Sequence, residues 1–205
     1  MPEIPDLGEA GERIVEDEDA GFVTRCRQGE TEAFSALVRK YQKKMLNVAF
    51  RMIGDYEEAC DVVQEAFLSC YRAIGKFRGE ARFSTWLCGI VLNRTRTFLK
   101  QKAARRQREG ISFDGSENLK TELFSLDESA EEGLEKQELE NSVQNCLGTL
   151  DNDQREVVIL RDIQGFSYEA IGLTLKLPLG TVRSRLFRGR VALKDCLVKK
   201  IGPLR

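Results

Sequence analysis

The segment SYEAIGLTLKLPLGTVRSRLFRGR, residues 167–190, decides the fold of the second half of this chain. A short amphipathic stretch, a tight turn of sequence LPLG at residues 177–180 and a basic second stretch follow one another without a gap. This order predicts a helix-turn-helix. Pro178 removes a backbone donor and is expected to stop the first helix, and Gly180 permits the unusual backbone angles of a sharp turn.

The second helix of this motif divides into a buried face and a basic face. Apolar residues and one glycine recur at helical spacing and are expected to face the core: Val182, Leu186, Gly189 and Leu193. The arginines between them point away, and such a helix can present guanidinium groups to DNA. A basic helix is often only a solvated face, but the preceding turn holds this one at a fixed angle to a scaffold, which favours DNA binding. Thr181 is expected to cap the N-terminus of this helix, where the positive end of the helix dipole suits a phosphate.

Composition excludes several classes of function. The chain has 205 residues, which suits one or two small domains, and no apolar run long enough to span a membrane. Its acidic N-terminus lacks the features of a secretory signal, so we expect a cytoplasmic protein. The six cysteines form no CxxC pair and histidine is absent, which excludes the usual mixed zinc sites and leaves no predicted metal or cofactor. Without histidine, a phosphate-binding glycine loop or a carboxylate dyad, we expect neither an enzyme nor a small-molecule substrate.

The charges are segregated although the net charge is only −1. One basic zone is the helix at residues 183–194, and a second runs from Arg94 to Arg108. Between Glu109 and Glu140, eleven acidic residues face only two lysines, and the segment has little periodicity. The sequence therefore predicts an all-α chain of two small helical domains joined by an acidic flexible linker. The expected bounds are a disordered N-terminus at 1–18, a first domain at 19–108, a linker at 109–133 and a second domain at 134–205.

Helix signals within the first domain are clear. We expect a short helix at residues 19–28, a long helix that Thr31 caps and Gly54-Asp55 ends, a third from Tyr56 to Ile74, and a fourth beginning near Phe83. Three cysteines fall in apolar helical patterns and are expected to be small core residues: Cys60, Cys70 and Cys88. In the second domain, the apolar run at residues 157–160 is expected to form the core on which the helix-turn-helix packs.

Three motifs then appear in order. DVVQEAF at residues 61–67, FRGEARFSTWL at 77–87, and SYEAIG with PLGTVRSRLFRGR in the quoted segment resemble the bacterial extracytoplasmic-function sigma factors. The resemblance covers nearly the whole chain apart from the acidic N-terminus and the linker. It implies a dissociable specificity subunit of RNA polymerase that is not itself an enzyme. Its region 2 would bind core polymerase and read the single-stranded minus-10 promoter element, and its region 4 would read the minus-35 duplex.

The resemblance also implies roles for individual residues. An acidic helix face would dock on basic clamp helices of core polymerase: Asp61, Gln64 and Glu65. The minus-10 reader, in which a base is extruded and held, would comprise Phe77, Arg78, Phe83, Thr85, Trp86, Asn93, Arg94, Arg96 and Lys100. The residues implied to contact the minus-35 duplex include Thr181 and Arg185 of the recognition helix. The full set is Arg161, Ser167, Tyr168, Glu169, Thr181, Arg183, Ser184, Arg185, Phe187 and Arg188. Taken singly, Phe83 and Trp86 are favoured as core residues, and Tyr168 could equally be a core residue.

Some features of the chain leave alternatives open. Lys176 occupies a turn position often given to glycine, and Gly172 and Gly189 stand where alanine is common in the family. The linker would either thread into polymerase or act as a plain tether. The family resemblance further implies an anti-sigma factor, commonly membrane-bound, as a partner. The other classes of function to be weighed are a free-standing helix-turn-helix regulator and an adaptor that binds only protein.

Overall fold

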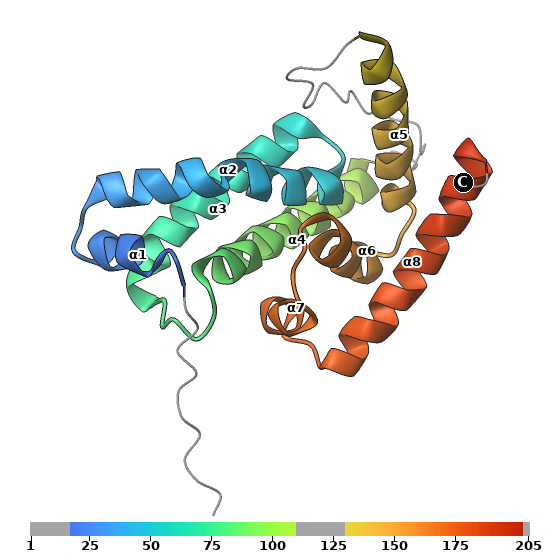
Figure 1. Cartoon of the computed structure of the whole chain (residues 1–205). Coiled ribbons are helices and arrows are strands. Elements are labelled where there is room, and N and C mark those ends of the chain that lie inside the picture. The colour runs from blue at the N-terminus through green and yellow to red at the C-terminus, as the bar shows by residue number, and fades with distance from the viewer. Residues whose placement is uncertain (1–16, 110–129, 203–205) are drawn as a thin grey trace, which may run out of the picture.

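The computed structural model describes residues 17–109 and 130–202. All regular secondary structure in these two ranges is helical. The first domain, which the resemblance equates with region 2 and which is called so below, is built from four helices and one short 3-10 turn. The second, equated with region 4, is built from four helices and one π-helical segment (Figure 1). The all-α expectation is therefore confirmed. The elements in chain order are α1 (Ala20–Arg27), α2 (Thr31–Ile53), α3 (Tyr56–Ala73), η1 (Ile74–Lys76), α4 (Phe83–Glu109), α5 (Ala130–Gly148), α6 (Asn152–Val158), η2 (Ile159–Ile163), α7 (Tyr168–Leu175) and α8 (Leu179–Ile201).

Helices α2, α3 and α4 pack on one another to form the body of region 2. The break between α2 and α3 lies at Gly54-Asp55, as expected from the sequence. Gly54 takes the left-handed conformation with φ of 87°, which ends α2. The carboxylate of Asp55 then accepts a hydrogen bond of 2.9 Å from the backbone N–H of Glu58 and caps α3. The expected cap at Thr31 is wrong, because Thr31 is already helical and Glu30, which caps nothing with its side chain, precedes it.

Two acidic residues at the start of the described chain anchor region 2. The Asp17 carboxylate accepts a hydrogen bond of 2.6 Å from the backbone N–H of Phe83 at the start of α4. Asp19 is buried and accepts hydrogen bonds from the Tyr41 hydroxyl and from the Lys40 ammonium. Asp17 thus has a defined place, although it falls within the segment expected to be disordered; residues 1–16 of that segment lie outside the described residues.

The helix-turn-helix of region 4 forms as expected, but its turn is placed differently. The left-handed residue is Lys176, with φ of 56°, and Pro178 is the residue that precedes α8. Gly180 lies inside α8 rather than in the turn, so the expectation for Gly180 is wrong. Thr181 is the third residue of α8, and its backbone N–H already donates to the carbonyl of Pro178 at 2.9 Å. The expected side-chain cap at Thr181 is therefore wrong as well.

The core of region 4 lies where the apolar run predicts it. All four residues of that run are at most 1% exposed: Val157, Val158, Ile159 and Leu160. On α8, Val182, Leu186 and Gly189 are buried and Leu193 is half-buried. A Cβ atom built on Gly189 would lie 2.7 Å from Cγ2 of Val158, so the glycine allows α8 to approach the segment from α6 closely.

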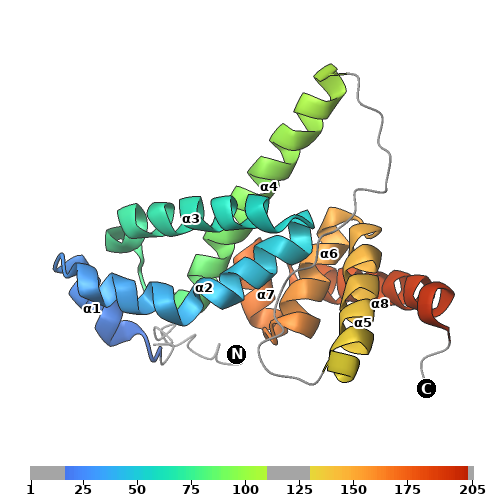
Figure 2. The same ribbon diagram turned by 90° about the horizontal axis from the view of Figure 1, so that it is seen from above.

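The two regions pack against each other. One hydrophobic cluster runs through buried residues of both, α7 contacts α4, and α5 contacts α2 (Figures 1 and 2). Most of the predicted linker, residues 110–129, lies outside the described residues. None of the helices in the described ranges combines the length and the apolar character that a bilayer crossing needs.

The close approach at Gly189 makes a prediction. Gly189→Ala is expected to lower the free energy of unfolding by about 1–3 kcal/mol, because the added methyl group meets a stiff β-branched side chain in a packed core. Gly180→Ala is the matched control on the same helix, since its Cβ would meet no atom within 4 Å. Alanine is the better helix former, so the control should be neutral or stabilising. Chemical denaturation of the two variants measures this; equal or reversed effects would contradict the packing described here.

Candidate nucleic-acid and protein interfaces

The outer face of α8 presents four of the residues expected to read the minus-35 duplex. Arg183, Ser184, Phe187 and Arg188 are all exposed, on the side opposite the buried Val182 and Leu186. Phe187 is 69% exposed, the largest fraction among the exposed large apolar residues of the described chain. The Phe187 ring therefore lies in solvent on the same face as the exposed arginines.

Two other arginines of α8 are held by acidic residues of region 4. Arg185 pairs with Asp153 through Nη2 and Oδ2 at 2.6 Å, and its side chain is only 22% exposed. Arg190 donates to both carboxylate oxygens of Asp162, with a distance of 3.0 Å from Nε to Oδ2. This hydrogen bonding raises the pKa of Arg190. Arg185 therefore supports the helix from within region 4, whereas the sequence analysis assigns it to the DNA-contacting set.

The remaining candidates for the minus-35 element cluster around the start of α7. The Ser167 hydroxyl caps this helix by accepting from the backbone N–H of Ala170 at 3.1 Å. Arg161 donates to the carbonyl of Phe166 at 2.8 Å and lies 4.9 Å from the ring centroid of Tyr168, which is half-buried. Glu169 is exposed in the first turn of α7, and hydrogen bonds from its own backbone N–H and from Ser167 lower its pKa. Thr181 is half-buried at the start of α8.

The aromatic residues expected to contact minus-10 bases are instead packed together. Phe77 and Phe83 are 7% and 0% exposed, and their ring centroids lie 6.0 Å apart in an edge-to-face arrangement. Trp86, half-buried, lies 5.0 Å from Phe77 between ring centroids. Thr85 is 7% exposed. These side chains form the core of the loop in this conformation, so a base-contacting role for Phe77 and Phe83 stays a prediction that requires the loop to move.

Polar members of the minus-10 set lie along the surface of α4 and the loop before it. Arg78 is exposed in the loop, and Asn93, Arg94 and Lys100 are exposed on α4. Arg94 donates to the Ser69 hydroxyl at 2.6 Å, so α3 holds it in place. These residues offer one amide and three cations to a nucleic-acid strand.

Arg96, the last member of that set, is bound to the other region. Its Nε and Nη2 donate to the two carboxylate oxygens of Glu156 on α6, each at 2.6 Å. Glu156 is 1% exposed, and its hydrogen bonds raise the pKa of Arg96. The guanidinium also donates, through Nη1, to the side-chain amide oxygen (Oδ1) of Asn93 at 3.3 Å. A buried carboxylate is stable only with a partner, so this pair ties region 4 to region 2.

Two further side chains of region 4 hold the C-terminal end of α2. Gln144 on α5, 3% exposed, donates to the carbonyls of Phe50 at 3.3 Å and Arg51 at 3.4 Å. Arg155 on α6 donates to the carbonyl of Met52 at 2.9 Å. The last carbonyls of a helix have no partner within it, and a cation there also suits the helix dipole. Region 4 therefore adds capping groups to the one that Gly54 supplies, whose backbone N–H donates to the Phe50 carbonyl at 2.7 Å.

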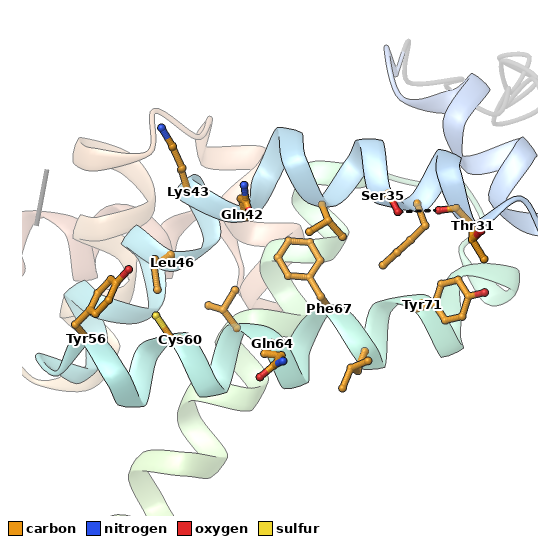
Figure 3. A pocket seen from close by; sticks show the side chains of 14 residues that line it. Thr31, Ser35, Gln42, Lys43, Leu46, Tyr56, Cys60, Gln64, Phe67 and Tyr71 are labelled. Carbon is orange, nitrogen blue, oxygen red and sulfur yellow. Dashed lines mark hydrogen bonds between the residues drawn. The ribbon is translucent and has the colours of Figure 1, made fainter. Parts of the chain in front are cut away.

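The acidic face expected to meet polymerase lies beside an apolar groove. Asp61, Gln64 and Glu65 are exposed on α3. The groove, of about 770 Å³, runs between α2 and α3, and Gln64 forms part of its wall. Figure 3 shows Phe67 and Tyr71 of α3 facing the Thr31 end of α2, with Leu46, Tyr56 and Cys60 at the other end. The surface combines a carboxylate row with an apolar depression, which suits an amphipathic basic helix.

Family comparisons agree with this architecture. The family described as sigma-70 region 2 matches residues 37–105, and sigma-70 region 4 matches residues 140–193. These matches place the chain among the sigma-70-type factors of RNA polymerase. Both matched ranges lie within the two domains expected from the sequence.

Curated relatives narrow this class. The chain is 37% identical to the RNA polymerase sigma-H factor of Pseudomonas aeruginosa, over 90% of this chain and 96% of the relative. It is 37% identical to the ECF RNA polymerase sigma-E factor of Haemophilus influenzae, over 91% and 96%. The Escherichia coli K12 sigma-E factor is 35% identical over 91% and 95%. The chain therefore belongs to the extracytoplasmic-function (ECF) family of RNA polymerase sigma factors.

Solved structures share the fold. CnrH, in complex with the cytosolic domain of CnrY, has a TM-score of 0.65 and 24% identity, and the match covers 90% of this chain and 99% of that one. The sigma factor RpoE of Bartonella quintana, in complex with the anti-sigma factor NepR, has a TM-score of 0.62 and 24% identity, covering 82% and 98%.

Three features of the site were not found from the sequence. They are the Arg96–Glu156 pair, the capping of α2 by Gln144 and Arg155, and the groove between α2 and α3. Glu156 stands directly before the apolar run, and an acid at the edge of a core segment is the only signal that pointed to it. The sequence held no signal that its partner is Arg96.

The ion pair between the regions makes a prediction. Glu156→Gln keeps the size of the side chain but removes the charge that holds Arg96, whose guanidinium can then turn to water. We expect regions 2 and 4 to separate more often, so the radius of gyration from small-angle X-ray scattering should increase. Asp162→Asn removes the same charge from a carboxylate that binds Arg190 within region 4, and should leave the radius unchanged. An unchanged radius for Glu156→Gln would contradict the role given to this pair.

Proposed function

We propose that this sigma factor delivers two promoter-reading surfaces, one on each region, to core RNA polymerase. The observation that carries the proposal is the outer face of α8, where Arg183, Ser184, Phe187 and Arg188 are exposed while the inner face is packed. The protein acts on promoter DNA in the cytoplasm through recognition, and performs no chemistry of its own.

Region 4 reads the minus-35 duplex by placing α8 in the major groove. Arg183 and Arg188 donate to guanine edges or phosphates, Ser184 to a base edge, and Phe187 contacts a thymine methyl group. Ser167 and Glu169 lie at the start of α7, where they orient the motif on the DNA backbone. The pairs that hold Arg185 and Arg190 keep α8 fixed against α6 and η2.

A comparison of two arginines on α8 tests this assignment. Arg183→Ala removes an exposed base-reading cation and should reduce run-off transcription by purified bacterial core polymerase about tenfold or more. Arg190→Ala removes a cation that Asp162 already holds and should have a much smaller effect. Starts mapped on fragments of the source genome should share a pair of upstream elements, and Arg183→Ala should lose those starts.

Two results would contradict the assignment. Equal losses for Arg183→Ala and Arg190→Ala would show that α8 contributes only net charge. Salt-sensitive binding to duplex DNA by the protein alone, with no polymerase-dependent starts, would identify a free-standing helix-turn-helix regulator instead.

Region 2 reads the minus-10 element along α4 and the loop before it. Asn93 hydrogen-bonds a base edge, while Arg94 and Lys100 hold phosphates. Arg78 lies in the loop, above the packed aromatic residues. The base pocket opens when this loop moves, which exposes the faces of Phe77, Phe83 and Trp86 for stacking, with Thr85 beside them.

Core polymerase docks on the acidic face of α3 and on the groove beside it. Asp61 and Glu65 lie four residues apart on one exposed face, so they attract a basic helix, and the groove takes its apolar residues. The exposed side chains of Leu68 and Tyr71 extend the apolar part of this surface. Polymerase then holds region 2 while region 4 moves away to the minus-35 element.

Charge reversal tests the docking surface. The double variant Asp61→Lys, Glu65→Lys should weaken binding to core polymerase by at least about tenfold at low salt, with a smaller difference at high salt because screening weakens charge pairing. Glu138→Lys on the exposed side of α5 is the control and should bind normally. Fluorescence anisotropy of labelled protein, titrated with core enzyme at several salt concentrations, measures this. Equal weakening in the control would show that only net charge matters.

The packed arrangement of the two regions hides part of the promoter-reading surface. Glu156 takes donors from Nε and Nη2 of Arg96, which leaves less of that guanidinium for a phosphate, and α7 lies against α4 near Gly89, where a Cβ would meet Thr174 at 3.9 Å. We expect binding to polymerase to separate the regions. We propose further that an anti-sigma factor, commonly a membrane protein, holds this chain inactive at the membrane. A cognate partner encoded beside its gene should co-purify with it, and failure of all neighbouring products to bind would count against this.

A further inference from the structure

Cys146 and Cys196 form a disulfide bond between two helices of region 4 that the sequence analysis did not anticipate. The bond joins α5 to α8 across fifty positions of the chain, with a Cα–Cα distance of 5.7 Å. Figure 1 shows α5 lying beside the C-terminal half of α8, and the two helices are in contact. Cys146 is 0% exposed, whereas Cys196 is half-buried and can be reached from solvent.

The C-terminal half of α8 has little else to hold it. The buried residues of α8, Val182, Leu186 and Gly189, all lie in its N-terminal half. Beyond them only Leu193 and Leu197 are half-buried besides the cysteine, and the other residues of 191–201 are exposed. The disulfide is therefore the main restraint that keeps this end of α8 against α5.

The disulfide also affects the contact between the two regions. Gln144 lies two residues before Cys146 on α5, and its buried amide donates to the carbonyls of Phe50 and Arg51 on α2. Fixing α5 on α8 therefore also fixes the amide that caps α2. With the bond formed, Gln144, Arg155 and Glu156 present one rigid surface to region 2; without it, α5 can move away independently.

The other cysteines are poorly suited to compete for an oxidant. Burial raises the pKa of Cys70 and of Cys88 to about 12, and it raises that of Cys26 as well, so these groups remain thiols. Cys60 is the exception, because it is half-buried at the wall of the groove between α2 and α3. Among the described cysteines, Cys146 and Cys196 are the bonded pair, and the other four are free.

We propose that Cys146 and Cys196 are a thiol–disulfide regulatory site, at which oxidation fastens α5 to α8 and thereby favours the packed, inactive arrangement of regions 2 and 4. The oxidant is a small-molecule disulfide of the glutathione class. The Cys196 thiolate attacks one of its sulfurs and releases one thiol; the Cys146 thiolate then attacks Cys196 and releases the second. The two protein thiols lose two electrons, the oxidant gains them, and the two thiol protons end on the released thiols.

The effect on transcription rests on the proposed function, but the site itself is tested without polymerase. Full-length protein carrying Cys60→Ser is equilibrated in reduced and in oxidised glutathione. Oxidation should remove the mass of two hydrogen atoms, with no glutathione left attached. Hydrogen exchange of residues 191–201 and of 139–148 should slow by about tenfold or more, and the radius of gyration should fall. Adding Cys196→Ser should abolish all three changes.

Three results would overturn the proposal. Free thiols that persist in oxidised glutathione would show that the pair is not a redox site. A disulfide that forms without slowing exchange in either segment would show that it restrains nothing. A disulfide that slows exchange but leaves the radius unchanged would remove its link to the arrangement of the two regions. Failure of the protein to support transcription, with all three changes present, would instead count against the proposed function alone.

Discussion

Glu156 places a carboxylate where almost no solvent reaches it, and the guanidinium of Arg96 from the other region compensates for that burial. Removing a charge from water costs roughly several kcal/mol unless a well-placed partner compensates for it. The packed arrangement is therefore the one in which Glu156 is satisfied. In any open form the Glu156 carboxylate must be hydrated or bind another cation. Its polarity makes opening of the interface possible, and its pairing with Arg96 favours one specific closed arrangement.

The arginines of α8 are distributed in two ways in this chain of nearly zero net charge. Arg185 and Arg190 are paired with acidic residues inside region 4, whereas Arg183 and Arg188 are exposed on the surface that we propose contacts DNA. On α3 the exposed acids lie beside an apolar groove instead. The same residue type thus supports the fold at some positions of α8 and is left exposed at others.

Local patterns in the sequence predicted the helices and most of the core. The apolar run at Val157 and its neighbours, the helical spacing on α8 and the Gly54-Asp55 break were all confirmed, because each depends on neighbours within a few residues. The predicted caps at Thr31 and Thr181 were wrong, since each helix begins earlier than the predicted cap allows. At α8, the backbone N–H of Thr181 itself donates to the Pro178 carbonyl. The contacts that join the regions, and the disulfide, depend on residues fifty or more positions apart, which no periodicity in one sequence brings together.

The central claim is that regions 2 and 4 are packed together in the free protein and separate on core polymerase. The most direct test is the distance between a label at Arg72 on α3 and one at Lys194 on α8, both exposed, introduced by genetic encoding so that the native cysteines stay unlabelled. In the free protein we expect a predominantly short distance distribution, which narrows when the Cys146–Cys196 disulfide forms, and a shift to a long distance when core polymerase is added to the reduced protein. A broad, long distribution in the free protein, or no change on adding polymerase, would contradict the claim.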